Sequence, residues 1–188
     1  MAKQCILILG GARSGKSRFA QQLATGLGER VLFVATAEPL DEEMHLRIDR
    51  HKKDRPKTWR TVEVPTSVAK AIGEYVEDVD VVILDCLSLL LANLISLTHD
   101  SVELEQGNYD AVEKEMSAEL EGLVTLAEDL PFRLIIVSNE VGMGLVPVSP
   151  VGRAYRDLLG RANQFIARHA DRVYLVVAGI PLELKSMN

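Results

Sequence analysis

The sequence predicts an α/β protein, built as a three-layer sandwich around a mostly parallel central sheet. Two observations lead to this prediction: apolar runs rich in β-branched residues recur along the chain, and segments with helical periodicity lie between them. Nearly continuous apolar runs are typical of strands that are covered on both faces, as in a parallel sheet. Alternating strands and helices require right-handed crossovers, which place helices on both sides of the sheet.

Each strand is predicted from one apolar run. The runs are CILILG at 5–10, VLFVAT at 31–36, VVILDC at 81–86, LIIVSN at 134–139 and VYLVVAG at 173–179. The segment TWRTVEVP at 58–65 alternates between polar and apolar residues, which favours an additional strand there.

The intervening segments predict helices. These are expected near 15–27, 41–53, 66–77, 110–128 and 152–169. The second of them has the clearest beginning, because Asp41 can cap it and the carboxylates of Glu42 and Glu43 suit the positive end of a helix. The apolar stretch at 86–97 falls short of the roughly 20 residues that span a bilayer. We therefore expect it in the protein core.

Length and charge limit the class of protein. A chain of 188 residues is expected to form one domain over 1–188, since a domain has roughly 150 residues. The formal net charge of −6 argues against a nucleic-acid partner and against binding to an anionic membrane. Cys5 and Cys86 lie in apolar runs without metal-ligand spacing, which predicts core residues in a reducing compartment. The first apolar run is too short for a signal peptide, so the expected location is cytoplasmic.

The segment GGARSGKS at 10–17 matches the pattern G-x-x-x-x-G-K-S/T, directly after a predicted strand and before a predicted helix. Gly10 and Gly15 allow the backbone N–H groups to turn inward, where they bind phosphate oxygens at a helix N-terminus. Lys16 would reach the β- and γ-phosphates, and the hydroxyl of Ser17 would bind Mg²⁺. The motif in this context predicts a nucleotide site and a P-loop NTPase-like fold.

Two acidic residues follow other predicted strands. Asp85 ends the run DVVILD, where a P-loop protein needs a carboxylate for Mg²⁺. Glu140 follows LIIVSN at the carboxyl edge of the sheet, where open α/β sheets bind their ligands. Glu140 is therefore a candidate to orient or deprotonate an attacking hydroxyl, and the alternative is that it only caps its own loop.

A cationic cluster surrounds one histidine in the segment HLRIDRHKKDRP at 45–56. Its members besides His51 are Arg47, Arg50, Lys52, Lys53 and Arg55. One explanation is a solvated helix end, since Lys and Arg suit helix C-termini and Pro56 stops the helix. The other is chemical, because a neutral imidazole can attack the α-phosphate of a nucleotide while cations stabilise the departing pyrophosphate.

The P-loop alone leaves several functions open. The chain contains no Asn-Lys-x-Asp stretch, so a regulatory GTPase of the Ras type is not expected. No basic face or oligonucleotide motif favours a helicase-like role. The remaining classes are a small-molecule kinase, a nucleotidyltransferase and a non-catalytic regulatory module that binds nucleotides.

Nearly end to end, the chain resembles the bifunctional adenosylcobinamide kinase / adenosylcobinamide-phosphate guanylyltransferase family of cobalamin biosynthesis. The matching stretches are GGARSGKSRFA (10–20), ATAEPLDEEMHLRIDRHKKDRP (35–56), WRTVE (59–63), ILDCLSLLLANL (83–94), VSNEVGMGLVP (137–147), YRDLLGRANQ (155–164) and AGIPLELK (178–185). The second and fifth stretches are specific to this family, whereas the P-loop alone is not.

The resemblance implies two reactions. A nucleoside triphosphate, ATP or GTP, phosphorylates a hydroxyl of the corrinoid adenosylcobinamide, and GMP from GTP is then joined to the product to give adenosylcobinamide-GDP and pyrophosphate. The guanylylated histidine of the family matches His51; some relatives carry two adjacent histidines, whereas this chain has Arg50 before His51. The family also implies a trimer, for which 86–97 is one candidate contact.

The family's nucleotide contacts carry over residue by residue. They match Gly10, Gly11, Ala12, Arg13, Ser14, Gly15, Lys16, Ser17, Ala35, Thr36, Ala37, Lys52, Lys53, Asp54, Arg55, Glu63 and Asp85.

Overall fold

The computed structural model describes residues 4–39, 42–53, 55–98 and 106–186, apart from the side chains of some helix residues, His51 among them. The strands are β1 (Gln4–Gly10), β2 (Val31–Ala35), β3 (Arg60–Glu63), β4 (Val81–Asp85), β5 (Arg133–Val137), β6 (Arg172–Val177) and β7 (Ile180–Lys185). The helices are α1 (Lys16–Leu27), α2 (Glu42–Lys53), α3 (Val68–Tyr75), α4 (Leu87–Thr98), α5 (Gln106–Asp129) and α6 (Pro150–His169). Every strand and helix expected from the sequence is present, with ends that differ by a few residues.

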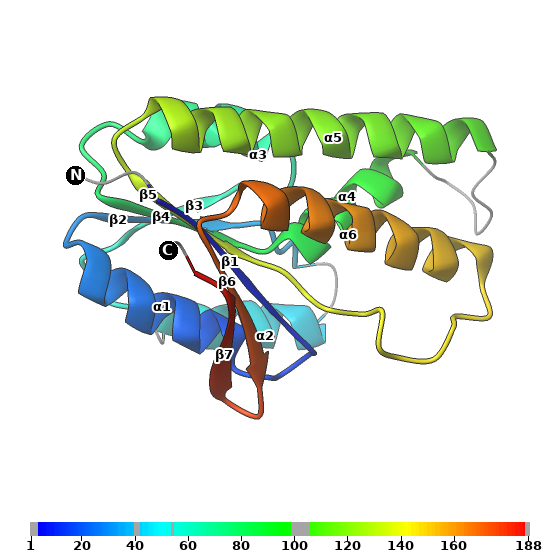
Figure 1. Cartoon of the computed structure of the whole chain (residues 1–188), viewed down its shortest axis with the longest axis horizontal. Coiled ribbons are helices and arrows are strands. Elements are labelled where there is room, and N and C mark those ends of the chain that lie inside the picture. Colours follow the sequence, from blue (N-terminus) through cyan, green and yellow to red (C-terminus); the bar gives the residue numbers. More distant parts are fainter. Residues whose placement is uncertain (1–3, 40–41, 54, 99–105, 187–188) are drawn as a thin grey trace.

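The strands form one sheet in the order β3-β2-β4-β5-β1-β6-β7. All neighbouring strands are parallel except β6 and β7, which are antiparallel. Helices α3, α4, α5 and α6 cover one face of the sheet, and α1 and α2 lie on the other (Figure 1). This arrangement confirms the predicted three-layer α/β sandwich, and the alternating segment at 58–65 supplies the edge strand β3.

Alternate residues of each central strand face two separate cores. In β1, Leu7 packs into the core on the side of α3 to α6, whereas Ile6 and Ile8 pack into the core that contains Ala20 and Ala24 of α1. All of these side chains are essentially inaccessible to solvent. Complete burial of one such aliphatic side chain stabilises the fold by roughly 1.5–3 kcal/mol. The two covered faces explain why the strands appear in the sequence as unbroken apolar runs.

Helix α4 is not among the helices predicted from the sequence. Its leucines and isoleucine come in close succession, so no amphipathic period marks it as a helix. Leu87, Leu90, Leu91 and Leu94 are buried, which confirms the expectation that 86–97 belongs to the core. Among the exposed apolar side chains of the described chain, α4 contributes Leu97, so this helix offers little surface for an oligomer contact.

Strand β7 was also missing from the predicted elements. It follows a tight turn in which Ala178 and Gly179 have φ values of +50° and +82°. Such turns match the twist of a two-stranded hairpin. Pro181 argues against a strand in the sequence, but it is tolerated here because β7 is at the edge of the sheet and pairs only with β6.

The two cysteines are free and buried. Burial raises the pKa of the Cys5 thiol to about 12 and that of Cys86 to about 11. Both thiols therefore stay protonated and unreactive near neutral pH, as expected for core residues. In the described part of the chain, no helix combines the length and apolar character that crossing a membrane requires.

Candidate functional site

The P-loop connects β1 to α1 at the carboxyl edge of the sheet. Gly10 and Gly15 have φ values of +154° and +101°, which side chains rarely adopt. A Cβ on Gly10 would also lie 2.4 Å from the carbonyl oxygen of Val176. Gly15 precedes the first turn of α1, which has no side-chain cap. The N–H groups of that turn are therefore suited to bind phosphate oxygens.

Lys16 is 7% exposed, although lysine is rarely buried. Its Nζ donates a hydrogen bond of 2.6 Å to the carbonyl oxygen of Gly11, so the ammonium group lies against the backbone of its own loop. The positive charge of Lys16 also acts on the thiol of Cys86, the residue after Asp85. Lys16 and the end of β4 therefore belong to one site.

Two other loops fix the position of the P-loop. The backbone N–H of Glu140 donates to the carbonyl oxygen of Gly10 at 2.9 Å. On the other side, the N–H of Gly179 donates to the carbonyl oxygen of Ser14 at 2.8 Å. The P-loop is thus held between the segment after β5 and the turn of the β6–β7 hairpin.

Strand register brings the predicted nucleotide residues into one row. Glu63 pairs with Ala35, and Ala35 pairs with Asp85. Asp85 is level with Val137, which pairs in turn with Ile8 of β1. Gly10 lies two residues farther along β1. The carboxylates of Glu63 and Asp85 therefore share the sheet edge with the P-loop, and the position of Asp85 at the end of its strand agrees with the sequence prediction.

Arg55 places a half-buried cation at the same edge. Its guanidinium lies 3.7 Å from the centre of the Phe33 ring, and its Nε and Nη1 are buried without a hydrogen-bond partner among the described residues. Burial lowers the pKa of Arg55, whereas the charges of Asp85 and Glu63 raise it. A cation that is poorly hydrated and has unused donors is well suited to bind an anionic ligand.

The end of α2 is tied to this row of residues. Nζ of Lys52 forms an ion pair of 2.5 Å with Oε1 of Glu63. The exposed Lys53 ends the helix, and the backbone of His51 is in the same last turn. The side chain of His51 and all of Asp54 lie outside the described residues.

Thr36 is placed at the site, but its hydroxyl is used inside the protein. Its Oγ1 accepts from the N–H of Cys86 and donates to the carbonyl oxygen of Cys86, both at 2.8 Å. Asn93 of α4, which the sequence did not indicate, donates to the carbonyl oxygen of Thr36 at 2.8 Å. Thr36 therefore joins the ends of β2 and β4, and its neighbour Ala37 is half-buried.

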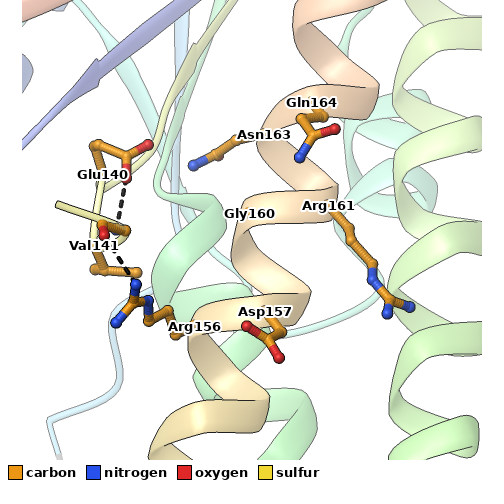
Figure 2. Close-up of a pocket in the computed structure, with 9 residues that line it drawn as sticks. Glu140, Val141, Arg156, Asp157, Gly160, Arg161, Asn163 and Gln164 are labelled. Carbon is orange, nitrogen blue, oxygen red and sulfur yellow. Dashed lines mark hydrogen bonds between the residues drawn. The ribbon is translucent and has the colours of Figure 1, made fainter. Parts of the chain in front are cut away.

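Glu140 has both positions that the sequence left open. Its Oε1 accepts a hydrogen bond of 2.6 Å from the N–H of Gly142, so the carboxylate does cap its own loop. The same carboxylate also lines a pocket between that loop and α6 (Figure 2). Capping and a role at the site are therefore compatible.

Sequence reasoning missed two residues of α6 that line this pocket, Arg156 and Asn163. One signal could have indicated Asn163. It lies on the buried side of an amphipathic helix, among Leu159, Ala162 and Ile166, where an apolar residue is expected. A polar side chain on such a stripe needs hydrogen-bond partners or a ligand. Arg156 gives no comparable signal.

Known proteins resemble this chain over nearly its whole length. The family model described as "Cobinamide kinase / cobinamide phosphate guanyltransferase" matches residues 6–184. The chain is 40% identical over 180 residues to the bifunctional adenosylcobalamin biosynthesis protein CobU of Escherichia coli, covering 96% of this chain and 99% of the relative. It is 42% identical over 179 residues to the bifunctional adenosylcobalamin biosynthesis protein CobP of Pseudomonas aeruginosa, covering 95% and 96%.

A solved structure supports the fold independently. An ATPase domain superposes with a TM-score of 0.55 at 14% identity, covering 92% of this chain and 69% of that chain. This likeness confirms the P-loop NTPase-like architecture. The length of the family match and the identity to its curated relatives then establish that the chain belongs to the cobinamide kinase / cobinamide phosphate guanyltransferase family.

Proposed function

We propose that the chain phosphorylates adenosylcobinamide with a nucleoside triphosphate and then transfers GMP from GTP, through a guanylylated histidine, to give adenosylcobinamide-GDP and pyrophosphate. The observation that supports this most is the shared sheet edge. The P-loop, the carboxylates of Glu63 and Asp85, and the cationic end of α2 all meet there. A kinase alone does not need the last of these.

The first step uses the P-loop. The oxygen of the corrinoid hydroxyl attacks the γ-phosphorus, the bond to the β–γ bridging oxygen breaks, and the nucleoside diphosphate leaves. Lys16 and the loop N–H groups stabilise the charge on the transferring group. The hydroxyl has to lose its proton. We assign Glu140, which follows β5 beside Gly10, to orient this hydroxyl or to remove its proton.

The second step uses the end of α2. A ring nitrogen of His51 attacks the α-phosphorus of GTP, and the bond to the α–β bridging oxygen breaks as pyrophosphate leaves. A phosphate oxygen of the phosphorylated corrinoid then attacks the same phosphorus, which breaks the P–N bond and regenerates the histidine. We assign Lys52, Lys53 and Arg55 to binding the phosphates. The unpaired donors of Arg55 support this role.

Mg²⁺ fits the donors available at the P-loop. The described residues contain no group of three or more His, Cys, Asp or Glu that could hold a metal ion. Mg²⁺ in phosphoryl-transfer sites needs only one or two protein oxygens, since phosphates and water supply the rest. We assign those oxygens to Ser17 and Asp85. The ion would neutralise charge on the nucleotide phosphates.

Labelled nucleotide tests the proposal directly. Incubation with Mg²⁺ and GTP carrying label on the α-phosphate is expected to give an acid-labile protein adduct, and addition of phosphorylated adenosylcobinamide should move the label to the corrinoid. A chelator of divalent ions should abolish both signals. Two alternatives remain distinguishable. Phosphorylation without the adduct would indicate a single-activity kinase, and GTP binding without either product would indicate a regulatory module.

We also propose that the chain assembles as the trimer implied by its family, through the β6–β7 hairpin. Cross-strand pairing places Leu175 opposite Leu182 and Val177 opposite Ile180 on one face. Three of these side chains are largely exposed: Val177 by 59%, Ile180 by 66% and Leu182 by 58%. An apolar edge hairpin of this kind is a typical association surface.

Light scattering on the purified protein tests this interface. A mass near three times that of the 20.7 kDa chain is expected. Leu182→Asp should reduce it toward the monomer, because a buried carboxylate is costly. Glu183→Gln is the matched control, since Glu183 faces Arg172 instead. A trimer that survives Leu182→Asp would exclude the hairpin as the main contact.

A further inference from the structure

A pocket of about 280 Å³ lies between the segment after β5 and helix α6 (Figure 2). Its lining residues are Glu140, Val141, Gly142, Arg156, Asp157, Gly160, Arg161, Asn163 and Gln164. Ligand pockets for drug-sized molecules occupy roughly 300–1,000 Å³. This pocket can therefore hold a side arm of a large molecule but not a macrocycle.

Asn163 gives the pocket a buried polar group with unused capacity. Its side-chain amide donates from Nδ2 to the carbonyl oxygen of Asn139 at 3.0 Å, which fixes the orientation of the amide. The residue is 6% exposed, and its Oδ1 is buried with no hydrogen-bond partner among the described residues. An unpaired buried carbonyl is costly, so this oxygen is suited to accept a hydrogen bond from a ligand.

Arg156 supplies a donor on the same wall. Its Nη2 donates to the carbonyl oxygen of Gly142 at 3.0 Å, which ties the loop to α6. Its Nη1 is buried and has no hydrogen-bond partner among the described residues. One turn earlier, Arg153 donates to the carbonyl oxygens of Pro147 and Val148 and so holds the far end of the loop. The wall that presents Arg156 is therefore built from several contacts.

The pocket adjoins the phosphoryl-transfer site. Glu140 belongs to its lining, and the N–H of the same residue is bonded to Gly10, the first residue of the P-loop. A group bound between Glu140 and Asn163 would thus lie beside the nucleotide phosphates. In Figure 2, Asn163 projects from α6 toward the segment that carries Glu140, whereas Arg161 points away toward α5.

The charges in the pocket favour a neutral polar ligand group. Glu140 and Asp157 contribute carboxylates, and Arg161 is already paired with Glu113 at 2.5 Å. Arg156 alone would have to attract an anion against two carboxylates, which disfavours phosphate. A hydroxyl both donates and accepts, so it can pair with the Asn163 oxygen or with the Arg156 donor.

We propose that this pocket binds the hydroxyl-bearing arm of the corrinoid acceptor, with Asn163 and Arg156 as its binding residues, while the macrocycle stays outside. The inference rests on the proposed function, and it adds the acceptor subsite. Glu140, on the opposite wall, then faces the hydroxyl that is to be phosphorylated. The P-loop, which follows the adjacent strand β1, binds the nucleotide that donates the phosphoryl group.

Binding and kinetics on the full-length chain test this subsite. The affinity for adenosylcobinamide is measured by equilibrium dialysis, read from its visible absorbance, and KM is measured separately for adenosylcobinamide and for GTP. Arg156→Gln should weaken corrinoid binding and raise the KM for the corrinoid by roughly tenfold or more, since a hydrogen bond from a charged group is stronger than one between neutral groups. Asn163→Ala should act in the same direction. The KM for GTP should stay within about twofold of the wild-type value.

Arg168→Gln is the matched control, because Arg168 is an exposed arginine near the end of the same helix and outside the pocket. It should leave both KM values unchanged. If the wild-type protein forms product and Arg156→Gln binds the corrinoid as tightly as the wild type, the subsite proposal would be overturned. The proposed function would still stand. A second outcome is that the wild-type protein binds the corrinoid, both variants bind it weakly, and no product forms. This outcome would support the subsite and overturn the proposed function. Wild-type protein that does not bind the corrinoid would overturn both.

Discussion

Lys16→Ala is expected to reduce the rate of adenosylcobinamide phosphorylation by on the order of 10²-fold or more. Loss of one preorganised protein charge that acts on a transferring phosphoryl group typically has an effect of this size. The lysine already lies against the loop through its bond to Gly11 and is nearly inaccessible to solvent. Little reorganisation is therefore needed before it acts on a phosphate.

The measurement is the initial rate of phosphorylation with saturating nucleotide. Lys114→Ala provides the control, because Lys114 is an exposed lysine of α5, on the opposite side of the sheet from α1. A thermal unfolding curve close to that of the wild type would show that Lys16→Ala affects chemistry and not folding. Near wild-type kinase rates in Lys16→Ala would mean that the P-loop is not the phosphoryl-transfer site.

The position of the P-loop between a strand and a helix could be predicted because its sequence signal is local. Gly10, Gly15, Lys16 and Ser17 lie within eight consecutive residues between one strand and one helix. Backbone conformation alone then determines where the N–H groups and the ammonium group lie. The unbroken apolar strands were equally clear, since two covered faces remove the polar alternation that exposed sheets show.

Residues brought together by topology could only partly be predicted. The sequence placed Asp85 and Glu140 at strand ends, but the row from Glu63 through Asp85 depends on the strand order, which no local pattern encodes. Asn163 reaches Asn139 across 24 positions in the sequence, through the placement of α6. Its unused oxygen becomes visible only once that bond is known.

The two missed elements have different physical reasons. Helix α4 packs into the core through so many of its residues that the pattern loses the period of 3.6. Strand β7 carries Pro181, which normally argues against a strand, and is tolerated because one side of an edge strand needs no partner. In α4, burial on most sides hides the helical period. In β7, the unpaired outer edge makes the proline acceptable.

His51→Ala is expected to abolish the acid-labile GMP adduct and the formation of adenosylcobinamide-GDP. The last turn of α2, to which His51 belongs, is tied to the sheet edge by the Lys52–Glu63 ion pair, and the charge of the same Glu63 acts on the half-buried Arg55. Covalent transfer needs a nucleophilic nitrogen at that place, and the imidazole ring of a histidine can supply one. Phosphorylation uses the P-loop and a substrate hydroxyl, so it should persist at least in part.

One variant should therefore separate the two reactions. The assay follows label from the α-phosphate of GTP into protein, and a parallel assay follows phosphorylation of adenosylcobinamide. His45→Ala is the matched control, because His45 is exposed on the same helix and should leave the adduct intact. Lys52→Ala should slow guanylylation without removing it, since Lys52 supplies one charge among several. If His51→Ala still formed the adduct while His45→Ala did not, the nucleophile would be His45, and the cationic cluster at the end of α2 would have to bind the nucleotide without supplying the attacking nitrogen.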